Sequence, residues 1–251
     1  MTMAFRDNSK GSFRDKRSGM MRRTRDRLRL AYSNEDKLVG QVVNAIEDSD
    51  RTVNLFSERL REWYAVYDPE LKNADNVKYA KAVLEAKERE EGTVGGKVKL
   101  EDVEVMRTLA REIVSLSELR SSLEAYQKQL AERICPNVCQ LTEAAVAAKL
   151  IANAGSMQRL ATLPASTIQV LGAEKALFKH LKSGSPPPKH GIIFQHAYIS
   201  TAPKKQRGRI ARALATKIAI ATKADFFTKN NIAPKLRDDF EKRVRQIREK
   251  G

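Results

Sequence analysis

Apolar residues recur at helical spacing over two long stretches of the chain. The first stretch starts near Ser33 or Asn34, where Glu35 and Asp36 place acidic side chains near the positive end of a helix dipole. Its repeat positions are three or four residues apart, a spacing typical of the buried seam of a coiled coil. The repeat positions are Leu38, Val42, Ala45, Ser49, Val53, Phe56, Leu60, Trp63 and Tyr67.

The second stretch begins near Leu100. Each arm, of about 35 residues, would extend about 50 Å at about 1.5 Å per residue. Two such arms predict a long antiparallel coiled-coil hairpin over residues 33–134, which acts as a spacer and offers a surface for self-association. The repeat positions of the second arm are Leu109, Leu116, Leu123 and Leu130, with Ile113, Leu119 and Ile134 between them.

The segment between the two arms is polar. Asp68-Pro69 ends the first arm, residues 72–97 are mostly polar and charged, and the glycines near residue 95 predict a turn. A phosphate-binding loop needs four residues between its glycines and Ser or Thr after its lysine. Here three residues separate Gly92 from Gly96, and Val98 follows the lysine, so the turn is not a nucleotide site.

After Pro136 the composition changes, and residues 135–251 are expected to form a compact helical module. The fold class is therefore all-α, a long hairpin followed by this module. The expected elements are a small-residue helix over 144–155, a helix capped by Ser166 and running to about Lys182, a Pro-rich loop over 183–188, a short extended stretch over 191–199, and helices over 203–224 and 234–250.

Charge is unevenly distributed along the chain, whose 47 basic and 31 acidic residues give a net charge of +16. Residues 1–32 carry +7, residues 33–150 carry −5 and residues 151–251 carry +14. Two basic ends joined by a near-neutral spacer favour a polyanionic partner, although basic residues that only improve solubility are an alternative. Residues 1–32 have too few apolar positions to form a core and are expected to be a disordered basic tail, which either follows a phosphate backbone or is a solvated leader.

Basic residues also cluster on two helices of the module. In the expected helix over 203–224 they lie opposite an apolar stripe, so that one face is buried while the other is free to contact phosphates. A solvated charged face is the alternative. The stripe is Ile210, Leu214, Ile218 and Ala221; the cationic residues are Lys204, Lys205, Arg207, Arg209 and Arg212, and on the preceding helix Lys175, Lys179 and Lys182.

The residues that carry chemistry argue against an enzyme. His180, His190 and His196 lack a matched set of cysteines or carboxylates, so we expect neither metal nor cofactor. Cys135 and Cys139 are expected to be free thiols, because two cysteines cannot form a disulfide framework. No apolar run approaches the roughly 18 residues of a membrane helix, and the first residues lack the apolar core of a signal peptide.

Four motifs resemble one known family. LPASTIQVLGAEKALF at residues 163–178, PKHGIIFQ at 188–195 and QRGRIARALA at 206–215 are similar to the signature of the Nop domain. NLFSERLREWY at residues 54–64 is similar to the first coiled-coil arm of the archaeal-type box C/D ribonucleoprotein scaffold. The motifs occur in the same order as in the family, and the resemblance covers about residues 36–251.

This resemblance implies a non-catalytic scaffold with a Nop domain over residues 135–251. Such a scaffold binds a kink-turn RNA together with a small ribosomal-type kink-turn-binding protein, in a particle that guides RNA 2′-O-methylation or rRNA processing, and it self-associates through its coiled coil. A helix over Leu150–Leu160 and Phe178 are expected to pack in the core or to face the small protein. The residues expected to contact RNA are Glu174, Lys175, Lys182, Lys189, Gln195, Lys204, Lys205, Gln206, Arg207, Arg209 and Arg212.

The chain departs from the family in one respect. Family members of this type carry a globular amino-terminal domain that holds the methyltransferase fibrillarin, and a basic segment stands in its place here. Fibrillarin is therefore not expected as a partner. The alternatives are a paralogue that acts in ribosome assembly and an architectural coiled-coil protein with nonspecific RNA affinity. The expected location is cytoplasmic, or nucleolar or nuclear in a eukaryote.

Overall fold

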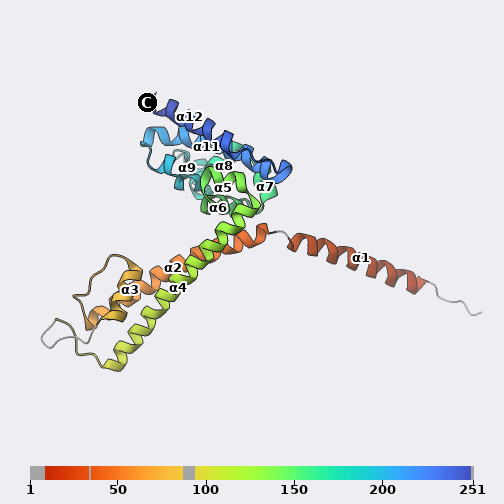
Figure 1. The fold of residues 1–251 in the computed structure, drawn as a ribbon. Coiled ribbons are helices and arrows are strands. Elements are labelled where there is room, and N and C mark those ends of the chain that lie inside the picture. The colour runs from red at the N-terminus through yellow and green to blue at the C-terminus, as the bar shows by residue number, and fades with distance from the viewer. Residues whose placement is uncertain (1–8, 34, 87–93, 250–251) are drawn as a thin grey trace, which may run out of the picture.

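The computed structural model describes residues 9–33, 35–86 and 94–249. Within these ranges every regular element is a helix and none is a strand, which confirms the all-α class. Figure 1 shows three parts: a helix α1 (Ser9–Tyr32) that projects from the molecule, a long helical hairpin and a compact helical module. In the same ranges, no helix has the length and apolar character needed to cross a bilayer.

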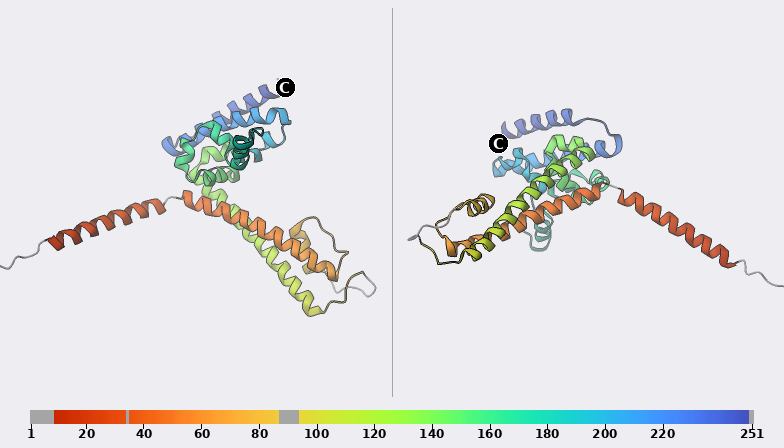
Figure 2. Two further views of the ribbon diagram at one scale, coloured as in Figure 1. Left: turned by 180° about the vertical axis from the view of Figure 1, so that it is seen from behind. Right: turned by 60° about the horizontal axis from the view of Figure 1, so that its bottom comes forward.

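The hairpin is formed by α2 (Asp36–Tyr67) and α4 (Leu100–Ile134), which run antiparallel and pack along each other (Figures 1 and 2). The expected seam is wrong at its first position and near its end, because Leu38 and Trp63 are 47% and 43% exposed. Val39 and Val43 are buried instead. The reason is that α6 (Ala144–Ala154) of the module packs against α2 and α4, so the start of α2 turns toward the module core.

A helix that the sequence did not predict packs against the far end of the hairpin. Helix α3 (Asn76–Glu85) lies within the segment expected to be a polar loop, and Asp75 caps it by accepting a hydrogen bond of 2.8 Å from the Lys78 amide. Tyr79 and Val83 are buried against α2 and α4. Tyr79, Ala80 and Val83 have helical spacing, but a helix of ten residues is too short for three buried positions to give a clear periodic signal. Gly92 of the expected turn lies outside the described residues.

The module surrounds one central helix, α11 (Lys204–Lys223). Ile210, Leu214, Ile218 and Ala221 are fully buried, which confirms the expected apolar stripe. Helix α11 packs against α5, α7, α8 and α12, so its other face is left to form a surface. The remaining elements are α5 (Pro136–Thr142), α6 (Ala144–Ala154), α7 (Met157–Thr162), α8 (Ala165–Val170), α9 (Glu174–Ser183), the 3₁₀ helix η1 (Ile192–Gln195), α10 (Ala197–Ser200), the π-helix η2 (Ala224–Thr228) and α12 (Ala233–Glu249).

Three expected elements of the module differ in the structure. The helix expected from Ser166 is two helices, α8 and α9, separated at Gly172, whose φ of +84° lies in the left-handed region that favours glycine. The stretch expected to be extended over 191–199 is η1 followed by α10. The helix expected over Leu150–Leu160 is divided at Gly155, which ends α6 with a φ of +88°.

The basic amino-terminal segment is helical where the sequence predicts disorder. Helix α1 contains seven arginines, two methionines, two leucines and no proline, so these residues have good helix propensity in spite of two glycines. The absence of a periodic core correctly indicates that the segment is not buried, but it does not exclude a helix. Phe13 and residues 15–29 are exposed, and both views in Figure 2 show α1 pointing away from the rest of the molecule. Residues 1–8 lie outside the described residues.

Candidate nucleic-acid interface

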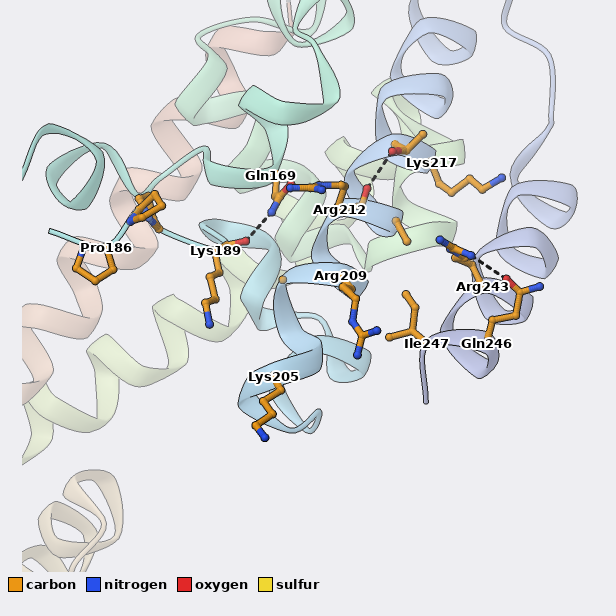
Figure 3. A pocket seen from close by; sticks show the side chains of 15 residues that line it. Gln169, Pro186, Lys189, Lys205, Arg209, Arg212, Lys217, Arg243, Gln246 and Ile247 are labelled. Carbon is orange, nitrogen blue, oxygen red and sulfur yellow. Dashed lines mark hydrogen bonds between the residues drawn. The ribbon is translucent and has the colours of Figure 1, made fainter. Parts of the chain in front are cut away.

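An open groove of about 850 Å³ lies between α11, α12 and the Pro-rich loop (Figure 3). We call it the basic groove. Four of the residues expected to contact RNA line it, namely Lys189 on the loop and Lys205, Arg209 and Arg212 on α11. Spacings of four and three residues place the three α11 side chains on one face of the helix. The other lining residues are Gln169, Pro186, Pro187, Pro188, Gly208, Ala213, Thr216, Lys217, Arg243, Gln246 and Ile247.

Backbone hydrogen bonds hold Lys189 at the edge of the groove. The Gln169 side-chain amide donates to the Lys189 carbonyl oxygen at 2.7 Å, and the Gly191 amide donates to the Gln169 carbonyl oxygen at 2.9 Å. A Cβ atom at Gly191 would overlap the carbonyl group of Leu171, so only glycine permits this close approach of the loop to α8. The loop is therefore fixed at its end, although the Pro-rich part has no regular structure.

The second wall of the groove comes from α12, which the sequence did not predict as part of the site. Arg243 donates a hydrogen bond of 2.9 Å to Gln246, and both side chains line the groove beside Ile247 (Figure 3). Lys217 is less available, since its ammonium group binds the Asp239 carboxylate at 2.9 Å and lowers the pKa of that carboxyl group.

The electrostatic character of the groove follows from its unpaired cations. Five cationic side chains line the groove in addition to Lys217. Within the part of the chain that the structure describes, none of the five forms an ion pair, and no carboxylate lines the groove. Cations gathered without counter-charges repel one another, and an anionic ligand relieves that repulsion. The five side chains are Lys189, Lys205, Arg209, Arg212 and Arg243.

Two of the expected RNA contacts are used inside the module instead. Arg207 donates hydrogen bonds of 2.8 Å to the Ala202 carbonyl oxygen and 3.2 Å to the Ser200 carbonyl oxygen. Its guanidinium carbon lies 5.3 Å from the centre of the Phe194 ring. Gln206 is buried, at 7% exposure. Arg207 thus fixes the start of α11, and neither residue lines the basic groove.

The His190 ring stacks on the other ring in this contact, that of Phe194. The His190 and Phe194 rings are 4.5 Å apart between centroids, with an interplanar angle of 16°. Partial burial lowers the pKa of His190, and the nearby Arg207 cation lowers it further. His190 therefore remains neutral at physiological pH and adds no charge to the groove.

The remaining expected contacts lie outside the groove. Glu174, Lys175 and Lys182 are exposed on α9, where the Glu174 carboxylate accepts a hydrogen bond of 2.7 Å from the Gly172 amide. Gln195 is exposed on η1 with its side-chain oxygen 3.4 Å from the Lys149 ammonium, and Lys204 is exposed at the start of α11. The structure thus divides the expected residues between the groove, the α9 face and the interior.

Helix α9 exposes apolar side chains as well as charges. Phe178 and Leu181 are 63% and 70% exposed, so Phe178 does not pack in the core, which was one of the two roles expected for it. The side chains of α9 include none that is buried. A small helix with exposed Phe and Leu on the surface of a compact module is typical of a protein-binding face.

Two thiols lie where the hairpin joins the module. The Sγ atoms of Cys135 and Cys139 are 3.8 Å apart, and the thiol hydrogen bond between them, together with burial, raises the pKa of Cys135. Such a protonated thiol is a poor nucleophile. Among the described residues, no group of three or more His, Cys, Asp and Glu side chains is placed to hold a metal ion.

The chain is similar in sequence to known proteins. The family profile described as "Nop: snoRNA binding domain, fibrillarin" matches residues 45–246. An uncharacterised NOP5 family protein of Methanocaldococcus jannaschii is 44% identical over 241 residues, which cover 86% of this chain and 58% of that protein. Nucleolar protein 56 of Homo sapiens is 34% identical over 256 residues, which cover 88% of this chain and 43% of that protein. The chain spans about half the length of these curated relatives.

A solved structure has the same arrangement of helices. A chain in the crystal structure of a fibrillarin/Nop5p complex superposes with a TM-score of 0.59 at 30% sequence identity, covering 98% of this chain and 86% of that chain. The family profile includes most of the hairpin and the helices that line the basic groove. The chain therefore belongs to the Nop family.

Proposed function

We propose that this chain is a non-catalytic RNA-binding scaffold whose basic groove binds the phosphate backbone of an RNA. The observation that carries the proposal is the set of five cations that line the groove without an ion pair among the described residues. Phosphate binding by arginine and lysine supplies most of the affinity in such interfaces, while the shape of the groove selects the bound structure.

We further propose that the RNA is a kink turn already bound by a small ribosomal-type protein, within a box C/D ribonucleoprotein that guides 2′-O-methylation or rRNA processing. Membership of the Nop family supports this proposal, since the matching profile is described as a snoRNA-binding domain. The exposed Phe178 and Leu181 on α9 supply an apolar surface for the small protein, beside the expected RNA contacts Lys175 and Lys182.

Fibrillarin binding is tested separately. The relative of known structure was solved in a complex with fibrillarin, whereas the described residues before the hairpin form a single basic helix, α1. We therefore expect the chain to bind the RNA–protein complex without retaining fibrillarin in a pulldown. Retention of fibrillarin would contradict the hypothesis that this chain is a paralogue that acts without a methyltransferase.

Fluorescence anisotropy with a labelled kink-turn RNA tests the proposed function. We expect much tighter binding to the RNA when the kink-turn protein is present than to the RNA alone. The double variant Arg209→Ala, Arg212→Ala is expected to weaken RNA binding by about 1–3 kcal/mol for each lost contact. The control Lys223→Ala, at the far end of α11, is expected to leave RNA affinity unchanged. Equal binding to RNA with and without the small protein would instead favour an architectural protein with nonspecific RNA affinity.

A further inference from the structure

Helix α1 presents an apolar stripe that the molecule leaves uncovered. Phe13, Met20, Met21 and Leu28 are 79%, 70%, 51% and 48% exposed, and spacings of seven and eight residues place them on one side of the helix. An isolated helix of this size is only marginally stable in water, and exposed apolar patches commonly mark a binding surface. The stripe therefore indicates that α1 packs against a partner.

The surroundings of the stripe define the chemistry of that partner. Lys16, Arg17 and Arg25 lie beside the apolar side chains around one shallow hollow of about 580 Å³. A matching surface needs an apolar floor and a negatively charged rim. RNA matches the charge but offers no buried surface for a stripe of Phe and Met side chains.

The same chain has a groove with these properties, which we call the acidic groove. It has a volume of about 690 Å³ where α4, α5 and α6 meet, and it contains three glutamates and one lysine. Glu124 is paired with Arg120 at 3.0 Å, whereas Glu132 and Glu143 form no ion pair within the described ranges. The floor includes Pro136, Cys139, Ala144 and Ala145.

One residue of the acidic groove is held in a strained conformation. Glu143 has a φ of 82° and a ψ of 150°, a region of backbone conformation that is almost reserved for glycine. Its side chain is exposed at the rim of the groove. Glycine would relieve the strain, so the carboxylate at this position has a cost in stability that a binding role explains.

We propose that α1 of one copy of the chain binds in the acidic groove of a second copy, and that reciprocal exchange gives a symmetric dimer. The apolar stripe meets the apolar floor, and the cations beside the stripe meet Glu132 and Glu143. The face of α1 from Phe13 to Arg25 is about 18 Å long, while the α4 wall from Glu124 to Glu132 is about 12 Å and α5 continues it.

The direction of α1 favours a second copy over the same chain. Both views of Figure 2 show α1 leaving the molecule at the start of α2 and extending away from the hairpin and the module. The Lys37 ammonium group lies 4.3 Å from the centre of the Tyr32 ring. Exchange of a projecting helix between two copies is a common route to a symmetric dimer. This interface is separate from any self-association through the tip of the hairpin.

Analytical ultracentrifugation of the full chain without RNA tests this dimer through charge reversal. One variant carries Lys16→Glu, Arg17→Glu and Arg25→Glu, and the other carries Glu132→Lys and Glu143→Lys. Each variant alone is expected to have a dimer Kd raised about tenfold or more, because like charges face each other at both interfaces. Lys242→Glu reverses an exposed cation on α12 that lines neither groove, and this control is expected to leave the Kd unchanged.

An equal mixture of the two reversal variants gives the decisive result. The mixed dimer has one native interface and one in which both partners are reversed, so its Kd is expected to return to near that of the native chain. A native chain that stays monomeric, a dimer insensitive to the α1 variant, or a mixture without recovery each overturns the proposal. Loss of RNA binding with an unchanged dimer would assign α1 to RNA instead, which also overturns it.

Glu143→Gly separates the role of the carboxylate from its strain. This variant is expected to raise the melting temperature of the module while it weakens the dimer. A variant that is less stable than the native chain, or one whose dimer Kd is unchanged, contradicts the role given to Glu143.

Discussion

The side-chain amide of Asn137 donates a hydrogen bond of 2.6 Å to the carboxylate of Asp225, 88 residues further along the chain. The same carboxylate accepts bonds of 3.1 Å from the backbone amides of Asn137 and Val138, at the start of α5. The side-chain oxygen of Asn137 in turn accepts bonds from the amides of Ile232 and Ala233, at 2.7 and 2.8 Å. The start of α5 is thereby tied to η2 and to the start of α12, which carries one wall of the basic groove.

Asp225→Ala is expected to lower the free energy of unfolding by about 3 kcal/mol. The substitution leaves one N–H of the Asn137 side chain and two backbone amides buried without an acceptor, while the other N–H keeps its bond of 2.9 Å to the Asn230 carbonyl oxygen. Such unpaired donors are costly. Urea unfolding measures the change. Asp238→Ala, which removes an exposed carboxylate from α12, is the control and is expected to change stability by less than about 0.5 kcal/mol. Equal effects of the two substitutions would contradict this role of Asp225.

The stability contributed by Asp225 is also expected to depend on pH. Burial raises the pKa of Asp225, in spite of the hydrogen bonds from Asn137 and Val138, which lower it. A carboxyl group whose pKa is higher in the folded state favours folding most below its unfolded pKa, and that contribution is lost as pH rises through the folded pKa. The native chain should therefore gain stability relative to Asp225→Asn as pH falls from about 7 to about 4. A difference that stays constant over this range would show that the pKa is not raised.

Arg207 and Arg209 are expected to have different roles although they are two residues apart. Arg207→Ala removes the bonds to the Ser200 and Ala202 carbonyl oxygens and should lower the free energy of unfolding by about 1–3 kcal/mol. Arg209→Ala should leave stability within about 0.5 kcal/mol and lower RNA affinity. Thermal melting and RNA anisotropy of both variants measure the two effects. The assignment fails if Arg209→Ala is the more destabilising of the two.

The two arginines show what sequence reasoning could and could not predict. The stripe from Ile210 to Ala221 was predictable, because helical periodicity alone determines which face of α11 is buried. The carbonyl oxygens that bind Arg207 come from α10 and the residues after it, a segment that the sequence predicted to be extended up to residue 199. In the sequence alone, where α10 is not predicted, Arg207 and Arg209 appear equally available to bind RNA.

The contribution of α12 to the groove could not be predicted from the sequence, for a different reason. A charged face on α12 is visible in the sequence, but only packing against α11 turns Arg243 toward the same groove as Arg209. Helix α3 was missed because its ten residues are too few for a clear period, and the burial of Tyr79 depends on contacts with α2 and α4. Contacts between elements distant in the sequence decided both cases.

Arg243→Ala is expected to weaken RNA binding, whereas Arg245→Ala is not. Arg243 lines the basic groove, and Arg245 is an exposed arginine on the same helix that does not line it. Loss of one phosphate contact should lower affinity by about 1–3 kcal/mol and reduce the dependence of log K on log salt by about one. Titrations at several salt concentrations measure both quantities. Equal losses from the two variants would indicate a general effect of net charge in place of a defined groove.

Photo-crosslinking of an RNA to the assembled complex tests most directly whether the basic groove binds RNA. A kink-turn RNA containing 4-thiouridine would be combined with its small binding protein and this chain, irradiated, and analysed by mass spectrometry. The account predicts crosslinks to peptides of α11 around Lys205 to Arg212 and of α12 around Arg243, as well as to the loop at Lys189. Crosslinks that fall only on the hairpin or on α1, with none on these three segments, would contradict it.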